Sequence, residues 1–185
     1  MPRSGEPARQ RLQQAAIELF CERGYDQTTT AEIAARAGVT ERTFFRHFPD
    51  KREVLFDGEA VLRAALAASI ADAPDELGPM DTLFRAFRAL LPALEGNRSY
   101  AAPRQTVIAA TPALQERELA KLAVLTDALA TALKARGVAD LQATLAAQIG
   151  MAAFANATIG WLHNPDPGLG KRLDVALSEL KALLA

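Results

Sequence analysis

Apolar residues recur at helical spacing along almost the whole chain, and no run of alternating or β-branched residues indicates a strand. A first helix is expected to begin near Pro7 and to end before Gly24, residue types that suit the start and the end of a helix. Alanine and leucine are frequent while valine and isoleucine are scarce, which also favours helix. The buried face of this first helix would be the stripe Leu12, Ala16, Leu19 and Phe20.

Two short helices are expected next, in the segments AEIAARA and ERTFFRHF. Thr30 and Thr40 precede them as N-cap residues, and Pro49 closes the second. Gly38 lies between the two helices, where the chain can need a positive φ. Helices this short are unstable alone, so they must pack against the first helix. Asp50 is expected to cap a long helix that joins this unit to the rest of the chain.

The remaining chain is predicted to be helical as well. The tract DAPDELGP at 72–79 is the best loop candidate, and Pro92 and Pro103 should kink or end the helices that contain them. The sequence therefore predicts an all-α fold of about nine helices, with a helix-turn-helix domain at residues 1–50 and a ligand-binding and dimerisation bundle at residues 51–185. The bundle helices are expected near 80–95, 97–110, 113–136, 139–163 and 167–184.

Composition and charge narrow the class of protein. Half of the residues are hydrophobic and the formal net charge is −1, so the chain is globular and has no global excess of bases. Between Arg36 and Arg52, however, five bases stand against two acids. A local basic patch on a neutral protein suits specific binding to nucleic acid better than indiscriminate attraction to phosphate. Because Cys21 is the single cysteine, neither an intramolecular disulfide nor a cysteine-based zinc site is possible.

One uncharged stretch, from Leu141 to Pro165, is long enough to span a bilayer. It contains several polar residues, and its apolar part is mostly alanine and glycine, so it would insert poorly. The N-terminal segment MPRSGEPARQ lacks the apolar core of a signal peptide. We therefore expect a buried helix in a cytoplasmic protein without a membrane partner.

The segment from 31 to 48 carries the chemistry. Two short helices joined by a tight glycine-containing turn form a helix-turn-helix, whose second helix enters the major groove of DNA. Phe44 and Phe48 are four residues apart and should share the buried face of that helix. The opposite face could be merely solvated, but the turn, the caps and the phenylalanine pair occur in the expected order. The residues expected to contact DNA are Thr30, Thr40, Arg42, Thr43, Phe45, Arg46, His47 and Lys51.

Individual roles follow from side-chain chemistry. Arg42 suits a guanine edge, and Thr43 suits a thymine methyl group or a phosphate. Phe45 is not required by the core and could lie against a sugar or a thymine methyl group. Lys51 is expected to reach a phosphate.

The stretch TTTAEIAARAGVTERTFFRHFPDKREVL, residues 28–55, resembles the N-terminal domain of the TetR (tetracycline-repressor-like) family of bacterial regulators. The similarity covers residues 9–58 and implies a homodimeric repressor with a ligand pocket in its C-terminal domain. Two positions depart from the family pattern. Phe45 stands where tyrosine is frequent, which removes a phosphate hydrogen bond, and Arg46 stands where an aromatic residue or histidine is common, which should alter operator preference.

The segment at 110–133, ATPALQERELAKLAVLTDALATAL, is similar to the C-terminal domain of family members of the mycofactocin-regulator type. That similarity implies a long apolar effector such as a fatty acyl thioester. Pocket candidates are large apolar residues and isolated polar ones on inner helix faces, although a residue of this kind, taken singly, is more often core than ligand contact. Asn156 is the most informative, because a buried amide in an apolar helix needs a partner. The candidates are Phe84, Phe87, Arg88, Leu91, Val107, Met151, Phe154, Asn156, Thr158 and Trp161.

Two stripes near the C-terminus are candidates for a homodimer interface. Small residues at helical spacing would let another helix approach closely, and a leucine stripe on the last helix could join it in an intersubunit four-helix bundle. Both stripes could instead pack within one chain. The residues are Ala146, Gly150, Ala153, Ala157 and Gly160 in the first stripe, and Leu173, Leu177, Leu180 and Leu184 in the second.

Together these features favour a ligand-responsive DNA-binding transcriptional regulator, a repressor that binds a palindromic operator as a homodimer and is released by a small apolar effector. The alternative is a DNA-binding dimer without effector control, which an overfilled core without a pocket would favour. An enzyme is not expected. The two histidines, His47 and His163, lie in different units, and no metal, nucleophile or phosphate-loop motif is present, so no cofactor is predicted.

Overall fold

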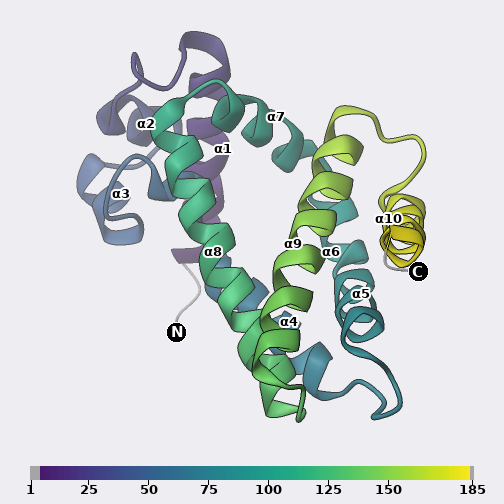
Figure 1. Cartoon of the computed structure of the whole chain (residues 1–185). Coiled ribbons are helices and arrows are strands. Elements are labelled where there is room, and N and C mark those ends of the chain that lie inside the picture. Colours follow the sequence, from purple (N-terminus) through teal and green to yellow (C-terminus); the bar gives the residue numbers. More distant parts are fainter. Residues whose placement is uncertain (1–4, 184–185) are drawn as a thin grey trace. The chain divides into compact units, whose positions relative to one another are not determined.

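The computed structural model describes residues 5–183, with side chains from residue 8 onward. Every regular element in this range is helical, which confirms the all-α fold class (Figure 1). The elements are α1 (Gly5–Arg23), α2 (Thr30–Arg36), α3 (Glu41–His47), the 3-10 turn η1 (Glu53–Leu55), α4 (Glu59–Ala71), α5 (Pro79–Ala89), α6 (Leu91–Gly96), α7 (Arg98–Ala109), α8 (Pro112–Ala135), α9 (Asp140–His163) and α10 (Leu169–Leu183).

The described chain divides into two compact units. The first combines the segment up to Asp57 with residues 99–118, so most of α7 and the first turns of α8 belong with α1, α2 and α3. The second comprises residues 58–98 and the chain after Glu118. The assignment of DNA binding to residues 1–50 and of ligand binding to residues 51–185 stays a prediction.

The first unit has one hydrophobic core. The stripe predicted on the first helix is buried there, together with the phenylalanine pair at the second short helix. Side chains of α7 and α8 enter the same core, which explains why residues 99–118 belong to this unit. The members from these elements include Leu12, Ala16, Leu19, Phe20, Phe44, Phe48, Val107, Ile108 and Leu114.

Polar contacts fasten the later segment to the same unit. Arg104 Nε donates to the carbonyl of Leu55 at 2.6 Å, and its Nη2 pairs with Glu118 at 2.8 Å. Arg117 Nε pairs with Glu53 at 2.7 Å. Both arginines are partly buried, so these contacts are less screened by water than pairs at the outer surface.

The prediction of a long helix beginning at Asp50 is wrong for the first part of that segment. Asp50 Oδ1 accepts the backbone N–H groups of Arg52 at 2.7 Å and Glu53 at 3.1 Å, as an N-cap residue does. The turn that follows is only the 3-10 segment η1. Residues 54–56 are all buried, and one face of a straight α-helix cannot bury three consecutive side chains.

The chain resumes as α4 after Gly58. This glycine has φ 86°, in the left-handed region that other residues rarely adopt. The break coincides with the limit between the two units, after Asp57. The covalent link on this side is therefore a glycine turn rather than the continuous helix that the sequence predicts.

Pro92 ends a helix as predicted, whereas Pro103 does not end the helix that contains it. α5 stops at Ala89 and α6 begins at Leu91, with Pro92 in its first turn, where a missing N–H costs little. Pro103 lies inside α7, which continues to Ala109. The later helices α8, α9 and α10 agree closely with the predicted ranges.

The second unit buries apolar faces of α4, α5, α8, α9 and α10 in one cluster. α9 packs against both α5 and α10. Among the described residues, α9 is the one helix whose length and composition would also suit a membrane span, a test that core helices of soluble proteins pass as well. Its buried residues lie inside this unit and are Ala143, Ala146, Ala147, Gly150, Met151, Ala157 and Trp161.

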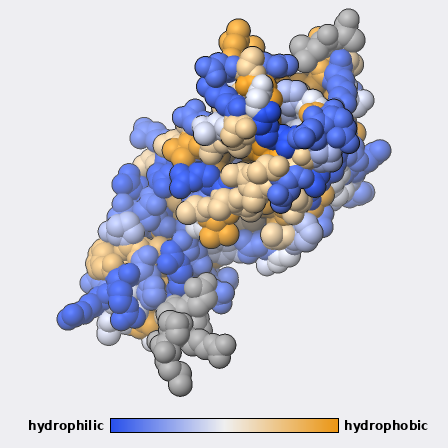
Figure 2. Space-filling model, turned by 90° about the horizontal axis from the view of Figure 1, so that it is seen from below, coloured by the Kyte–Doolittle hydropathy of each residue, from blue (hydrophilic) through white to orange (hydrophobic). Residues whose placement is uncertain are grey.

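Apolar residues also reach the surface. On the face drawn in Figure 2, hydrophobic patches interrupt a largely hydrophilic surface. The exposed large apolar side chains include Val61 of α4 and three residues of α9, namely Leu141, Leu145 and Ile159. Scattered exposed apolar residues are normal, but several on one helix can mark an interface.

Candidate functional site

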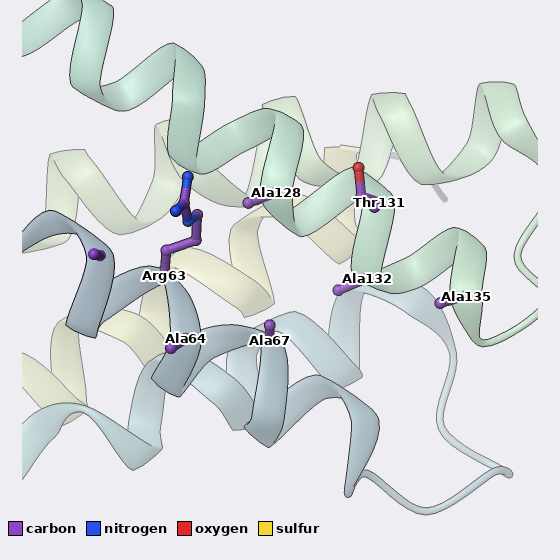
Figure 3. Close-up of a pocket in the computed structure, with 8 residues that line it drawn as sticks. Arg63, Ala64, Ala67, Ala128, Thr131, Ala132 and Ala135 are labelled. Carbon is purple, nitrogen blue, oxygen red and sulfur yellow. The ribbon is translucent and has the colours of Figure 1, made fainter.

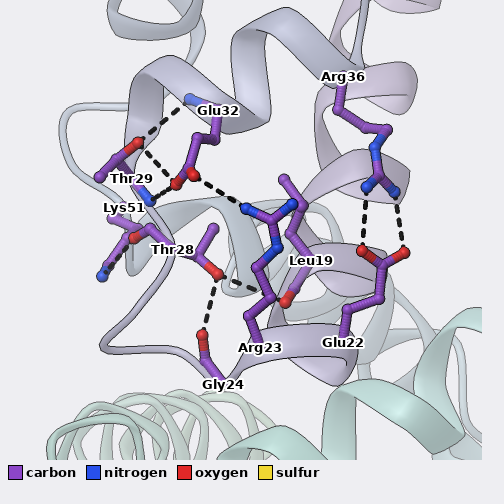
Figure 4. Close-up of polar contacts among 9 residues, drawn as sticks. All are labelled: Leu19, Glu22, Arg23, Gly24, Thr28, Thr29, Glu32, Arg36 and Lys51. Carbon is purple, nitrogen blue, oxygen red and sulfur yellow. Dashed lines mark hydrogen bonds and ion pairs between the residues drawn. The ribbon is translucent and has the colours of Figure 1, made fainter.

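The helix-turn-helix begins with a capping box, and its N-cap is Thr29 rather than the expected Thr30. Thr29 Oγ1 accepts the backbone N–H of Glu32 at 3.2 Å, and Glu32 Oε2 accepts the N–H of Thr29 at 2.9 Å (Figure 4). The hydrogen bonds that the Glu32 carboxylate accepts from the backbone and side chain of Thr29 lower its pKa. Thr30 becomes the first residue of α2, and its hydroxyl instead donates to Glu41 at 2.5 Å, which links α2 to α3.

The turn between α2 and α3 requires glycine, as predicted. Gly38 has φ 68°, in the left-handed region. The N–H of Val39 donates to the carbonyl of Ala34 at 2.9 Å, which closes the end of α2. Arg11 of α1 donates to the carbonyl of Ala37 at 3.1 Å, so the turn is also fastened to the first helix.

α3 presents one face to the core and the other to solvent. Thr40 caps it as predicted, because its Oγ1 accepts the N–H of Thr43 at 3.2 Å. Phe44 and Phe48 are buried with ring centroids 5.6 Å apart, which confirms their shared face. Phe45 is 51% exposed and meets Phe44 edge-on, at 5.4 Å between centroids. Core packing therefore fixes which side of α3 faces outward.

Most arginines around α3 are engaged within the protein. Arg36 bonds Glu22 through both terminal nitrogens, at 3.0 and 2.9 Å, and lowers the pKa of that carboxyl (Figure 4). Arg23 and Arg52 also pair with carboxylates, at 2.9 and 3.1 Å. Arg42 and Arg46 are exposed, and no residue among 8–183 hydrogen-bonds or ion-pairs with them.

The lack of an internal partner distinguishes Arg42 and Arg46 from the other arginines described in the first unit. Every other arginine that the structure describes in the first unit makes a hydrogen bond to a carboxylate or a carbonyl. Each such bond occupies part of the set of five N–H donors of a guanidinium and fixes its orientation. Arg42 and Arg46, one helical turn apart on α3, keep all of theirs for a partner.

Lys51 has a structural role that the sequence did not indicate. Its Nζ donates to the carbonyls of Tyr25 at 2.7 Å and Thr28 at 2.8 Å, and lies 4.1 Å from the centroid of the Tyr25 ring. Partial burial lowers its pKa. The ammonium holds the loop before α2, and one of its three N–H donors is left for a phosphate.

The other residues predicted to contact DNA lie on α3 or are bonded to it. Thr43 is partly buried, with its hydroxyl 3.0 Å from that of Thr40. His47 ends α3, and its ring centroid lies 6.4 Å from that of Phe48. Thr30 joins them through its bond to Glu41. The predicted set therefore converges on one short helix, except for Lys51.

The residues predicted to line a ligand pocket form no single site. Phe84, Phe87, Met151 and Trp161 are buried in the core of the second unit. Phe87 also stacks on Phe154, with 4.5 Å between ring centroids. These side chains pack on one another, which is the core alternative that the sequence left open.

The remaining pocket candidates are dispersed. Val107 belongs to the core of the first unit, and Arg88 pairs with a carboxylate of α10 at 2.7 Å. Leu91 and Thr158 are partly buried in the second unit. Asn156 is exposed, so the expectation of a buried amide at this position is wrong. It lies on the side of α9 that faces away from the core.

A groove of about 410 Å³ lies between α4 and α8, and none of the predicted pocket residues lines it. Alanine side chains are too short to fill the space between the two helices. Figure 3 shows the Arg63 side chain rising from α4 toward α8, with the alanines alongside. The lining residues are Ala60, Arg63, Ala64, Ala67, Ala128, Thr131, Ala132 and Ala135.

The sequence did contain a signal for this groove. On each helix the lining positions are spaced by three or four residues, from 60 to 67 and from 128 to 135. This spacing places each set on one helical face. Large apolar residues do not indicate the groove, because the open space arises where side chains are small.

The small-residue stripe predicted as a dimer interface lies in the chain's own core. Ala146, Gly150 and Ala157 are buried, and Ala153 packs against the same cluster. A Cβ atom on Gly150 would lie 2.9 Å from Cδ1 of Leu83 in α5. The stripe therefore allows α9 to approach α5 within one chain. Position 160 likewise faces α10, where a Cβ atom would meet an arginine side chain at 3.2 Å.

The leucine stripe of α10 also faces inward. Leu173 and Leu177 are buried in the core of the second unit, and Leu180 packs against it. Leu184 lies outside the described residues. Both predicted stripes are thus used within the chain, which is the second of the two possibilities that the sequence allowed.

α9 carries a second stripe on its outer face. The six residues of this outer stripe are all exposed, and at 100° per residue they fall within an arc of roughly 80°. The exposed fractions are 72% for Leu141, 47% for Leu145 and 40% for Ile159. The outer stripe consists of Leu141, Leu145, Gln148, Ala152, Asn156 and Ile159.

A basic helix with two unpaired arginines, oriented by a buried phenylalanine pair after a glycine turn, defines a helix-turn-helix DNA-binding protein. Residues 12–57 match the family described as "Bacterial regulatory proteins, tetR family", and residues 77–185 match the "MftR C-terminal domain". The protein belongs to the TetR family of bacterial transcriptional regulators. Both resemblances indicated by the sequence are thereby confirmed.

Relatives and solved structures agree with this family. The transcriptional regulator TcmR of Streptomyces glaucescens is 39% identical over 83 residues, which span 45% of this chain and 37% of TcmR. The TetR-family repressor FadR of Thermus thermophilus, solved with lauroyl-CoA, has a TM-score of 0.57 and 26% identity, covering 92% of this chain and 91% of FadR. The SmeT–triclosan complex, from Stenotrophomonas maltophilia SmeT, has a TM-score of 0.67 and 23% identity, covering 93% and 90%, and shows the fold alone.

Proposed function

We propose that the protein is a ligand-responsive repressor that binds a palindromic operator as a homodimer and is released by a small apolar effector. The observation that carries the proposal is the state of Arg42 and Arg46. They are the arginines of the described first unit that no internal carboxylate or carbonyl engages, and both project from the helix expected in the major groove.

The side chains of α3 suggest distinct contacts. Arg42 and Arg46 have the paired donors that recognise the N7 and O6 atoms of guanine. Phe45 has no polar atom, and its exposed ring suits a thymine methyl group or a sugar. The phosphate backbone of DNA would be held by Thr30, Thr40, Thr43, His47 and the third N–H of Lys51. Such contacts position the helix without recognising sequence.

The outer stripe of α9 is the proposed dimer interface. Its apolar side chains are exposed and recur at helical spacing. Such a face can pack against the same face of a second chain around a twofold axis. A twofold dimer presents two copies of α3 to half-sites about one helical turn apart or a multiple of it. The small-residue stripe of α9 is not proposed for this role, because side chains of α5 and α10 already lie against Gly150 and Gly160.

Charged residues in the outer stripe should split the dimer. The double substitution Leu145→Arg and Ile159→Arg is expected to give a folded monomer, since two cations would be buried against each other. Sedimentation velocity measures the assembly state, and circular dichroism confirms the fold. Ala123→Arg, at an exposed position of α8, is the matched control and should leave the dimer intact. A double variant that remains dimeric would place the interface elsewhere.

Effector control would act by a population shift. An effector that binds one arrangement of the dimer more tightly changes the separation of the two α3 helices, which then no longer match the half-sites. The lauroyl-CoA bound to Thermus thermophilus FadR supports an acyl thioester as the effector class. A DNA-binding dimer without effector control is the alternative, and it requires that the groove between α4 and α8 stay empty.

Selection of bound sequences from a random pool of DNA duplexes tests the function. We expect a palindrome to emerge at moderate salt, with a conserved guanine in each half-site. Non-specific phosphate binding falls steeply with salt, so the selection is repeated at two salt concentrations. Enrichment of no common sequence at either concentration would contradict the regulator proposal.

A further inference from the structure

We infer that the groove between α4 and α8 binds a slender amphipathic anion, with its hydrocarbon chain along the alanines and its charged head on Arg63. This inference rests on the proposed function, since it locates the effector site and names the ligand chemistry. The groove takes the place of the pocket predicted around Phe84, Phe87 and Phe154, because the rings of these residues pack on one another.

The shape of the groove favours an unbranched chain. The lining positions 60–67 and 128–135 each extend over about 10 Å of helix, at 1.5 Å per residue. Apart from Arg63 and Thr131, all the lining side chains are single methyl groups. The Thr131 hydroxyl donates to the carbonyl of Asp127 at 2.9 Å, so it is satisfied within its own helix. The groove thus offers a long apolar track that a chain of methylene groups can follow.

The charge of the groove favours an anion. Arg63 is exposed, and no residue among 8–183 hydrogen-bonds or ion-pairs with it. The other arginines described in the second unit each bond a carboxylate or a carbonyl. Among the described residues, Arg63 is therefore the arginine of the second unit without a bonded partner, as Arg42 and Arg46 are in the first. A guanidinium beside apolar surface attracts a carboxylate or phosphate more strongly than one in open water.

The helices that line the groove are also those that lead into the first unit. α4 begins directly after Gly58, at the limit between the units, and α8 runs through the second limit at Glu118. At the far end the pair is fastened, because Arg136 Nη1 donates to the carbonyls of Ile70 at 3.1 Å and Ala73 at 2.7 Å. A ligand that separates α4 from α8 would therefore act on the ends of these helices from which the chain continues into the first unit.

Calorimetric titration with sodium octanoate tests the site, with 1-octanol and octylammonium as probes of charge. We expect octanoate to bind more tightly than either, and Arg63→Gln to weaken octanoate about tenfold while leaving 1-octanol unchanged. Arg63→Lys should restore most of the affinity. Ala128→Leu should weaken all three probes at least tenfold, because the added side chain fills the track, whereas Ala123→Leu on the exposed face of α8 should not.

Two results would overturn the inference. One is equal octanoate binding by the parent protein, Arg63→Gln and Ala128→Leu, which would mean that the acid binds elsewhere or as a detergent. The other is no binding of octanoate to the folded parent protein. Operator binding without ligand is measured on the same variants and should be unchanged. If no operator is found, the proposed function fails, but the calorimetric result on the groove stands separately.

Discussion

Replacing Arg46 with alanine is expected to weaken binding to the selected operator about 10- to 100-fold, since one bidentate base contact contributes about 1–3 kcal/mol. Arg42→Ala should have an effect of similar size at a different base. In both variants the loss should be confined to one position of each half-site, because we propose that the unpaired guanidinium contacts a base edge rather than the DNA backbone. Fluorescence anisotropy with the operator and with single-base variants, at fixed salt, measures this.

The control is Arg85→Ala, an exposed arginine of the second unit that bonds the carbonyl of Ser69 at 3.0 Å. It should bind the operator as the parent protein does. If Arg46→Ala weakened all duplexes equally and reduced the salt dependence by one phosphate, Arg46 would be a backbone contact instead. That outcome would leave Phe45 and Arg42 as the candidates for base recognition.

Phe44→Ala is expected to destabilise the first unit by about 3–5 kcal/mol, the usual cost of removing a buried phenylalanine ring. Phe44 is fully buried and contacts both Phe45 and Phe48. A small domain has little stability to spare, so operator binding should be lost together with the fold. Urea denaturation followed by circular dichroism measures the free energy of unfolding.

Phe45→Ala is the matched variant, one residue further along the same helix. Because its ring is half exposed, the change should cost less than about 1.5 kcal/mol, mostly from the edge-on contact with Phe44. It should instead reduce operator affinity in a protein that remains folded. Equal destabilisation by the two variants would mean that Phe45 belongs to the core and not to the DNA-binding face.

The DNA-binding helix could be predicted because its signals are local. The glycine with positive φ, the Thr40 cap and the i, i+4 phenylalanine pair depend on neighbours in sequence, and all three are confirmed. The sequence could not show which cations have partners within the protein and which do not. Arg36, Lys51 and Arg52 belong to the same basic segment as Arg42 and Arg46, but their partners lie on other elements or in loops.

The groove that we propose as the ligand site could not be located from either helix alone, because an open groove depends on what two helices distant in sequence leave unfilled. Positions 60–67 and 128–135 are separated by some sixty residues of chain, and each row of alanines alone looks like an ordinary helix face. The aromatic residues that looked like a pocket fill the core instead. Arg63 is distinguished only by the partners that the other described arginines of its unit find, such as those of Arg85 and Arg88 on other helices.

The sequence by itself determined the all-α class, the two short helices with their buried phenylalanine pair, and the family, since turns and spacing act over a few residues. It also showed that α9 has stripes at helical spacing, but not which of them turns inward. The tertiary structure decided this. Gly150, which has no side chain, is the position where α9 can approach Leu83, so the small residues face the core. Leu145 and Ile159 are thereby left exposed, on the face that we propose as the dimer interface.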